Sequence, residues 1–210
     1  MVVTAIKGLV LNVLSTSKKN FVISPASKRG GFTLIELMMS ILLLGVLVSF
    51  AVPNMFRFYD KQSMIGQAKR FKTALEYARN EALSRIENVV VCSSTDGATC
   101  AGLNNWDQGW IIFVDRNSDN NTDFGSGQCL AAEDCMLKVD DPVPATWTLR
   151  GGSSLIGFTG TGDRSVGGGA IIFRLCGKDA LPANDIDYSR TVTINAAGGS
   201  HMSVGAAACP

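Results

Sequence analysis

The sequence predicts an α+β protein in which a long N-terminal helix precedes a β-rich globular head. Three observations support this class: an apolar run of helical length over residues 32–52, a helical repeat of apolar residues after it, and short β-rich runs beyond Asn88. With 210 residues and 46% apolar content, the chain is expected to bury one core and to carry one extension.

The N-terminal segment differs in charge from the rest of the chain. The whole sequence has a formal net charge of +1, yet residues 1–31 contain no acid. The basic residues of this segment are Lys7, Lys18, Lys19, Lys28 and Arg29. Basic residues ahead of an apolar run favour an N-terminus in the cytoplasm and a head on the far side of the membrane.

Between Phe32 and Val52 the only charged residue is Glu36. A helix of this length reaches about 31 Å, close to the thickness of a bilayer core. A carboxylate in such a run costs about 2.5–3.5 kcal/mol on insertion scales, so Glu36 indicates a function or a partner. If the chain is cut after Gly31, Phe32 gains an α-amino group close to one helical turn before Glu36, in the same or a neighbouring subunit. Pairing of these charges would fix the register of packed helices. An ordinary single-pass anchor is the alternative.

The segment "RGGFTLIELMMSILLLGVLVSFAVPNM" resembles the class III signal of type IV pilins and pseudopilins. The resemblance implies that a prepilin peptidase cuts between Gly31 and Phe32 and that Phe32 is then N-methylated. It also implies that Glu36 guides assembly of the helix into a filament core, and that Pro53 kinks the helix. The implied leader, residues 1–31, is long for this class, which a misassigned start codon would explain.

Apolar residues then recur every three or four positions, which predicts an amphipathic helix within residues 54–88. They are Ile65, Ala68, Phe71, Leu75, Ala78, Ala82 and Ile86. Together with the apolar run, they predict one helical rod from about Thr33 to Ile86. The other face carries Lys69, Lys72, Glu76, Arg79 and Arg85. These basic residues could contact DNA, but a solvated helix face is the simpler interpretation.

Residues 89–210 are expected to form the head, as an antiparallel sheet tied by disulfides. The expected strands are "VVVC", "GWIIFVD", "MLKV", "ATWTL", "SLIGF", "GAIIFRL", "RTVTIN" and "HMSVG". The runs "AKRFKTALEYARNEALSRIENVVVCSSTDGATC" and "WDQGWIIFVDRNSDNNTD" resemble the GspH/FimT branch of minor pilins, which includes FimU-like proteins. This resemblance extends over nearly all of residues 28–195 and implies a type IV pilin fold. The domains expected are a leader (1–31), a transmembrane and assembly helix (32–53), an amphipathic helix (54–88) and the head (89–210).

All six cysteines lie in the head, which points to disulfides and an oxidising compartment. Short loops favour the pairs Cys92–Cys100 and Cys129–Cys135, and Cys176–Cys209 would then tie down the C-terminus. A zinc site is the alternative, but no CxxC pair occurs and His201 stands apart from the cysteines.

The run "DRNSDNNTD" suggests a calcium loop, because oxygen-bearing residues occupy every second position as in an EF-hand. The candidate ligands are Asp115, Asn117, Asp119, Asn121 and Asp123. The match is incomplete, since Asn120 replaces the glycine at the sixth position and Ser126 replaces the glutamate at the twelfth. A turn rich in Asp and Asn is the alternative.

Other chemistry has little support in the sequence. The glycine-rich "GFTGTGDRSVGGGA" fits no phosphate or dinucleotide fingerprint, so no cofactor is expected. No nucleophile motif accompanies the single histidine, so no enzymatic activity is expected. Trp106, Trp110 and Trp147 could form a binding surface, although core filling is favoured for Trp110 and Trp147.

DNA uptake is a further alternative, because some FimT-like pilins carry a C-terminal "GRxR" segment. The corresponding positions here are Gly199, Ser200, His201 and Met202, which lack the arginines. The basic residues near the C-terminal strands are Arg174, Lys178 and Arg190. Three dispersed cations would give only a weak, salt-sensitive contact with DNA.

The resemblance therefore implies a minor pilin or pseudopilin that joins the tip or initiating complex of a type IV pilus. Its partners would be other minor and major pilins, the prepilin peptidase and an inner-membrane assembly platform. The chain would wait in the bacterial inner membrane with its head in the periplasm, and then enter an extracellular filament. A type II secretion pseudopilin shares these signals, but "VVVCSSTDGATC" favours the pilus. A tethered binding module that never polymerises is the interpretation left if the cut after Gly31 fails.

Overall fold

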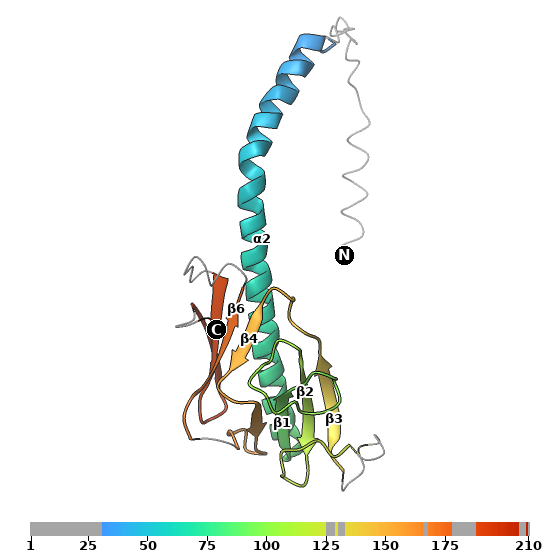
Figure 1. Ribbon diagram of the computed structural model, residues 1–210, viewed down its shortest axis with the longest axis vertical. Coiled ribbons are helices and arrows are strands. Elements are labelled where there is room, and N and C mark those ends of the chain that lie inside the picture. The colour runs from blue at the N-terminus through green and yellow to red at the C-terminus, as the bar shows by residue number, and fades with distance from the viewer. Residues whose placement is uncertain are drawn as a thin grey trace, which may run out of the picture. The chain divides into compact units, whose positions relative to one another are not determined.

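The computed structural model describes residues 31–124, 129, 133–165, 168–177, 188–205 and 209. The predicted leader lies outside the described residues except for Gly31. The chain divides into two compact units, Met1–Leu47 and Val48–Pro210. One helix, α2 (Leu34–Arg85), belongs to both, and the strands that follow belong to the second (Figure 1).

The predicted rod is confirmed as a continuous helix of 52 residues. It begins after Thr33 and runs through Pro53 without interruption. The prediction that Ile86 completes the buried face is wrong, since Ile86 is 81% exposed. Its φ of 57° takes it out of the helix and turns the chain toward the first strand. A Cβ at Gly160 would lie 2.7 Å from the Ile86 carbonyl carbon, so close backbone packing accompanies this unusual conformation.

Among the described residues, eight strands follow, one for each run that the sequence predicted. They are β1 (Asn88–Ser93), β2 (Trp110–Asp115), β3 (Cys135–Asp140), β4 (Thr148–Gly151), β5 (Leu155–Phe158), β6 (Ile171–Cys176), β7 (Ser189–Ile194) and β8 (Ser200–Val204). All their pairings are antiparallel. The predicted α+β class is therefore confirmed.

The strands form two four-stranded sheets, where one sheet was expected. Their orders are β3-β2-β1-β5 and β4-β6-β7-β8. The chain changes sheet three times, between β3 and β4, between β4 and β5, and between β5 and β6. At the second change, Gly151 packs closely against two aromatic side chains. A Cβ at Gly151 would lie 2.5 Å from Phe173 Cε1 and 2.7 Å from Trp106 Nε1. The chain can leave one sheet for the other here because glycine occupies the position.

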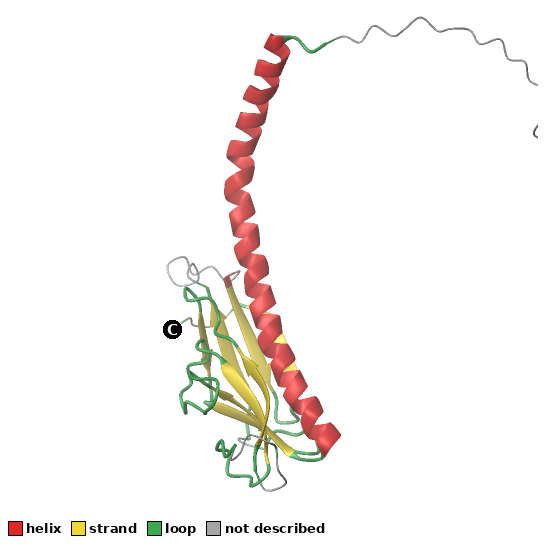
Figure 2. Cartoon of the chain, turned by 90° about the vertical axis from the view of Figure 1, so that its right-hand side faces the viewer, coloured by secondary structure: helices red, strands yellow, loops and turns green. Residues whose placement is uncertain are grey.

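Helix α2 lies along the strands and contributes one face to the main core (Figure 2). Its buried residues are Met64, Ala68, Phe71, Ala74, Leu75, Ala78 and Ala82. They pack against apolar side chains of both sheets, among them Ile112 of β2 and Phe173 of β6. Every residue of β2 is buried, because Ile111 and Phe113 point into a second cluster on the other face of that sheet.

All three tryptophans are buried, so they do not form an exposed binding surface. Trp106 fills the core like Trp110 and Trp147, and its Nε1 donates a hydrogen bond to the Ser153 carbonyl oxygen over 2.9 Å. The structure also contains three disulfides, Cys92–Cys100, Cys129–Cys135 and Cys176–Cys209, which are the pairs expected from the sequence.

Candidate functional site

The start of α2 places the residues of the expected processing and assembly site. The Thr33 carbonyl oxygen accepts a hydrogen bond from the Leu37 backbone N–H over 3.2 Å, and Thr33 Oγ1 accepts one from the Glu36 N–H over 3.3 Å. Thr33 is therefore the N-cap of the helix. Gly31 and Phe32 precede this cap and are exposed, so the bond expected to be cut lies just outside the helix.

Glu36 occupies the first turn of α2. Threonine at the cap with glutamate three residues later is the pattern of a capping box, a helix-start signal that the sequence analysis did not use. An acidic side chain is also favourable near the positive end of the helix dipole. Stabilisation of the helix start is therefore a candidate role for Glu36 that is separate from any pairing with another subunit.

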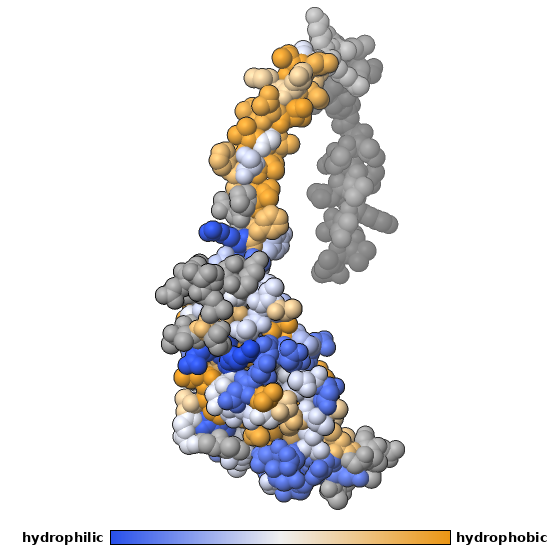
Figure 3. Space-filling model, viewed as in Figure 1, coloured by the Kyte–Doolittle hydropathy of each residue, from blue (hydrophilic) through white to orange (hydrophobic). Residues whose placement is uncertain are grey.

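Helix α2 is apolar and exposed from Leu34 to Phe50 in the isolated chain (Figure 3). Within the described part of the chain, no single helix is both long and apolar enough to cross a membrane. By length and composition, the bent pair Leu34–Phe50 and Met55–Arg85 could do so together. Pro53 lies between these two segments, and its role as a kink stays a prediction.

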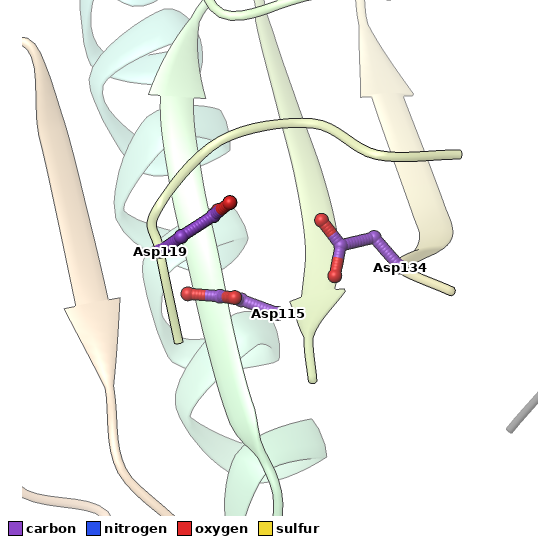
Figure 4. A group of neighbouring side chains, drawn as sticks. All are labelled: Asp115, Asp119 and Asp134. Carbon is purple, nitrogen blue, oxygen red and sulfur yellow. The ribbon is translucent and has the colours of Figure 1, made fainter. Parts of the chain in front are cut away.

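A second group of interest lies in the head, where β2 ends and β3 begins. Asp115 is the last residue of β2, Asp119 lies in the loop after it, and Asp134 immediately precedes β3. Each offers a carboxylate oxygen, and these oxygens lie within 4.8 Å of one another. Asp119 and Asp134 extend toward one another, with Asp115 beside them (Figure 4).

The pairing of β2 with β3 explains why Asp134 joins the group. Val114 lies opposite Cys135 in the antiparallel register, so the next residue of β2 and the preceding residue of β3 are brought together. Asp134 is not among the ligands expected from the sequence, because the EF-hand motif covers only the contiguous run after β2. The expected pairing of "GWIIFVD" with "MLKV" was the signal that could have revealed it.

The other calcium candidates take different roles. Asn117 Nδ2 donates to Asp119 Oδ2 over 3.0 Å and to Asp123 Oδ2 over 3.1 Å. Asn121 donates its backbone N–H to Asp119 Oδ1 over 2.7 Å. The structure therefore brings Asp115 and Asp119 together with Asp134, and it does not include Asp123 in that group of carboxylates. Ser126, the expected twelfth position, lies outside the described residues.

Backbone amides surround the buried carboxylates of this group. Asp134 accepts hydrogen bonds from the N–H groups of Arg116 and Asp123, each over 3.1 Å. Asp115 Oδ2 accepts one from Asn120 over 3.1 Å. Asp115 and Asp134 are only 2% and 3% exposed. Burial, followed by the nearby Asp134 charge, raises the pKa of Asp115 above its ordinary value, although the amide of Asn120 opposes this.

The basic residues considered for DNA do not form an exposed cluster in the described part of the head. Arg190 is buried and donates to the Ser189 carbonyl oxygen over 2.6 Å, and Arg174 is half-buried. Lys178 lies outside the described residues. On helix α2, Arg79 binds the carbonyl oxygens of Gly162 and Ala197 over 2.8 and 2.9 Å. Its guanidinium therefore joins the helix to two turns of the head and is not simply solvated.

Comparison with known proteins assigns the N-terminal segment and the head to the same class of protein. Residues 26–52 match the prokaryotic N-terminal methylation motif, so the chain is a prepilin-type subunit of the kind that is anchored in a membrane and assembled into a filament. Residues 67–198, more than half of the chain, match the family described as Type II transport protein GspH. The chain belongs to the GspH family, which comprises minor pilins and pseudopilins.

Solved structures of such subunits are similar to this chain. Two crystal structures of the type IV minor pilin FimU of Pseudomonas aeruginosa share 21% and 22% identity with it, with TM-scores of 0.44 and 0.48. The matches span 65% and 70% of this chain and 89% and 92% of the FimU chains. The minor pseudopilin EpsH of the Vibrio cholerae type 2 secretion system shares 10% identity over 66% of this chain and 94% of its own, with a TM-score of 0.42. No curated protein matches the chain.

Proposed function

We propose that the chain is made as a precursor, that a prepilin peptidase cuts it between Gly31 and Phe32, and that Phe32 is then N-methylated. The mature subunit would wait in the bacterial inner membrane with its N-terminus at the cytoplasmic side and its head in the periplasm. It would then join the tip or initiating complex of a type IV pilus with other minor and major pilins. Its role is structural: the subunit packs and primes the filament.

The observation that carries this proposal is the exposed apolar surface of α2 from Leu34 to Phe50. Apolar surface of this extent is covered in a working protein by lipid or by other chains. The methylation motif spans the same residues, which favours first lipid and then the helices of neighbouring subunits as the cover.

Glu36 would guide the passage from lipid to filament. It is the single charged residue from Phe32 to Val52, and lipid offers it no counter-charge. The α-amino group of Phe32, created by the cut, would supply that charge in the same or an adjacent subunit. Helices in any other register would leave the carboxylate unpaired, so the pairing would select one vertical position.

A role as a type II secretion pseudopilin is the second candidate. The description of the matching family as a type II transport protein favours it. Both candidates require the same cut and the same helix, so they differ in the filament that the subunit enters. Deletion of the coding sequence in its natural host would separate them, because loss of surface pili supports the pilus and loss of protein secretion supports the second candidate.

The processing step is tested by replacing Gly31 with leucine. Mass spectrometry of the wild-type subunit should give a chain that starts at a methylated Phe32. The Gly31→Leu variant should instead retain residues 1–31. The matched control is Gly45→Leu, a bulky change at another exposed position of the segment, where no atom lies within 4 Å of an added Cβ. The control should be cut normally. A Gly31→Leu variant of mature length would show that the proposed cut is wrong.

A further inference from the structure

We propose that Asp115, Asp119 and Asp134 form a binding site in the head for a divalent cation of the calcium class. The proposal rests on the described head alone and does not depend on the filament that the subunit joins. It replaces the ligand set expected from the loop sequence, because the third carboxylate comes from the far end of the β2–β3 connection.

The spacing of the three carboxylates suits calcium. Ca²⁺ binds oxygen at about 2.3–2.6 Å, so ligands on opposite sides of the ion lie up to about 5 Å apart. The three carboxylate oxygens lie within 4.8 Å of one another. Mg²⁺ binds at about 2.0–2.1 Å, which would require tighter closure of the same group. The group therefore accommodates calcium without closing further.

An independent observation points to a missing cation. The Oδ1 atom of Asp115 is fully buried and accepts no hydrogen bond. A buried carboxylate oxygen without a donor or cation is costly, and a second buried carboxylate beside it adds like-charge repulsion when both are ionised. Asp134 is buried next to Asp115, so a divalent cation between them would offset both costs at once.

The loop already holds the carboxylates in place through its backbone. The N–H groups of Arg116 and Asp123 bind Asp134, and that of Asn120 binds Asp115 Oδ2. Each carboxylate oxygen can accept more than one interaction, so these bonds leave coordination sites available. Because these bonds already order the loop, cation binding would cost little further loop entropy. This preorganisation favours affinity.

The loop also resolves one of the two mismatches with an EF-hand. Asn120 stands where that motif has glycine, and its φ of 61° shows that asparagine adopts the left-handed conformation required there. Asp134 supplies the third carboxylate of the group, in place of the missing glutamate. The remaining ligands of a six- to eight-coordinate ion would be carbonyl oxygens and water.

Solvent reaches the group at Asp119, which is exposed, and a cavity lies beside the buried Asp115. Asp115 lines a cavity of about 350 Å³ together with Ile86, Glu87, Asn88 and Arg116. Arg116 Nε forms an ion pair with Glu87 Oε1 over 3.2 Å, so the arginine at this cavity has a carboxylate partner of its own. A cation can therefore approach the group from the side of the exposed Asp119.

The test is calcium titration of the purified full-length chain in detergent after treatment with EDTA. Calorimetry should show one calcium ion bound per chain in the micromolar to millimolar range, with magnesium at least ten-fold weaker. At ten-fold excess over Kd, the melting temperature of the head should rise by about 3–6 °C. An unchanged melting temperature and no heat at 5 mM calcium would overturn the proposal.

Asp119→Asn is the informative variant, because Asp119 is exposed and its replacement should leave the fold intact. Calcium affinity should fall at least ten-fold. The matched control, Asp163→Asn, changes an exposed aspartate outside the group and should bind calcium as the wild type does. Wild-type affinity in Asp119→Asn, or an equal loss in Asp163→Asn, would show that the binding is not at this site.

Discussion

The ring of Phe71, on helix α2, lies 4.9 Å from the ring of Phe173, on β6. The same Phe71 ring lies edge-on to Trp110 of the other sheet, with centroids 5.1 Å apart. One helical side chain thus contacts both sheets, and Trp106 closes the group at 5.6 Å. The helix and the two sheets share a single aromatic centre, so they should unfold together.

Replacing Phe71 with alanine should reduce the free energy of unfolding of the head by about 3–5 kcal/mol, because a fully buried ring leaves a cavity. Urea unfolding followed by tryptophan fluorescence measures this change, since all three tryptophans lie in the head. Phe58→Ala on the same helix is the control, and it should change stability by less than about 0.5 kcal/mol because Phe58 is 54% exposed. Equal effects of the two changes would contradict the central role of Phe71.

Much of this fold follows from local sequence patterns. The spacing of Ala68, Phe71 and Leu75 predicts the buried face of α2, and alternation of strand and turn residues predicts all eight strands. Such patterns report which residues share a face or a strand. They do not report which strands pair, because pairing depends on contacts between segments distant in the sequence.

The division into two sheets and the position of Asp134, which were not expected from the sequence, depend on such distant contacts. The division into two sheets depends on β5 pairing with β1 and on β4 pairing with β6. Asp134 joins Asp115 only because β3 pairs back on β2. In contrast, Gly31 and Glu36 were expected as processing and assembly residues because a processing signal is read as a contiguous segment, and their roles stay predictions.

Gly198 should be among the least replaceable residues of the head. Its φ is +74°, and an added Cβ would lie 2.2 Å from the carbonyl oxygen of Gly162. Gly198→Ala should therefore cost more than about 2 kcal/mol, through backbone strain and overpacking combined. Gly102→Ala isolates the strain, because Gly102 has a φ of +67° with open space around it, and should cost about 1 kcal/mol. Urea unfolding measures both losses. Equal losses for the two variants would contradict the close contact between Gly198 and the carbonyl oxygen of Gly162.

The three disulfides should stabilise the head unequally. Their sequence separations are 8, 6 and 33 residues for Cys92–Cys100, Cys129–Cys135 and Cys176–Cys209. Loop-closure entropy then predicts losses of about 2.5, 2.2 and 3.7 kcal/mol when each pair is replaced by alanines. Urea unfolding of the three double variants checks this order. A Cys176→Ala, Cys209→Ala protein as stable as the other two would indicate that the C-terminal bridge acts mainly on the folded state.

Glu36 has two candidate roles, and substitution can separate them. If its charge sets the register of packed helices, Glu36→Gln should be processed normally but should enter filaments at least ten-fold less than the wild type. Glutamine still suits the third position of a capping box, so this variant keeps the helix start while removing the charge. The amount of subunit in sheared filaments, divided by the amount left in the membrane, gives the measurement.

Thr33→Ala provides the complementary change. It removes the hydroxyl that accepts the Glu36 N–H and should cost about 1 kcal/mol at the helix start, while Glu36 keeps its charge. On the register hypothesis this variant should enter filaments nearly as well as the wild type. Efficient assembly of Glu36→Gln together with poor assembly of Thr33→Ala would instead assign Glu36 to helix capping. The two variants therefore decide whether this carboxylate acts on its own helix or on a neighbouring subunit.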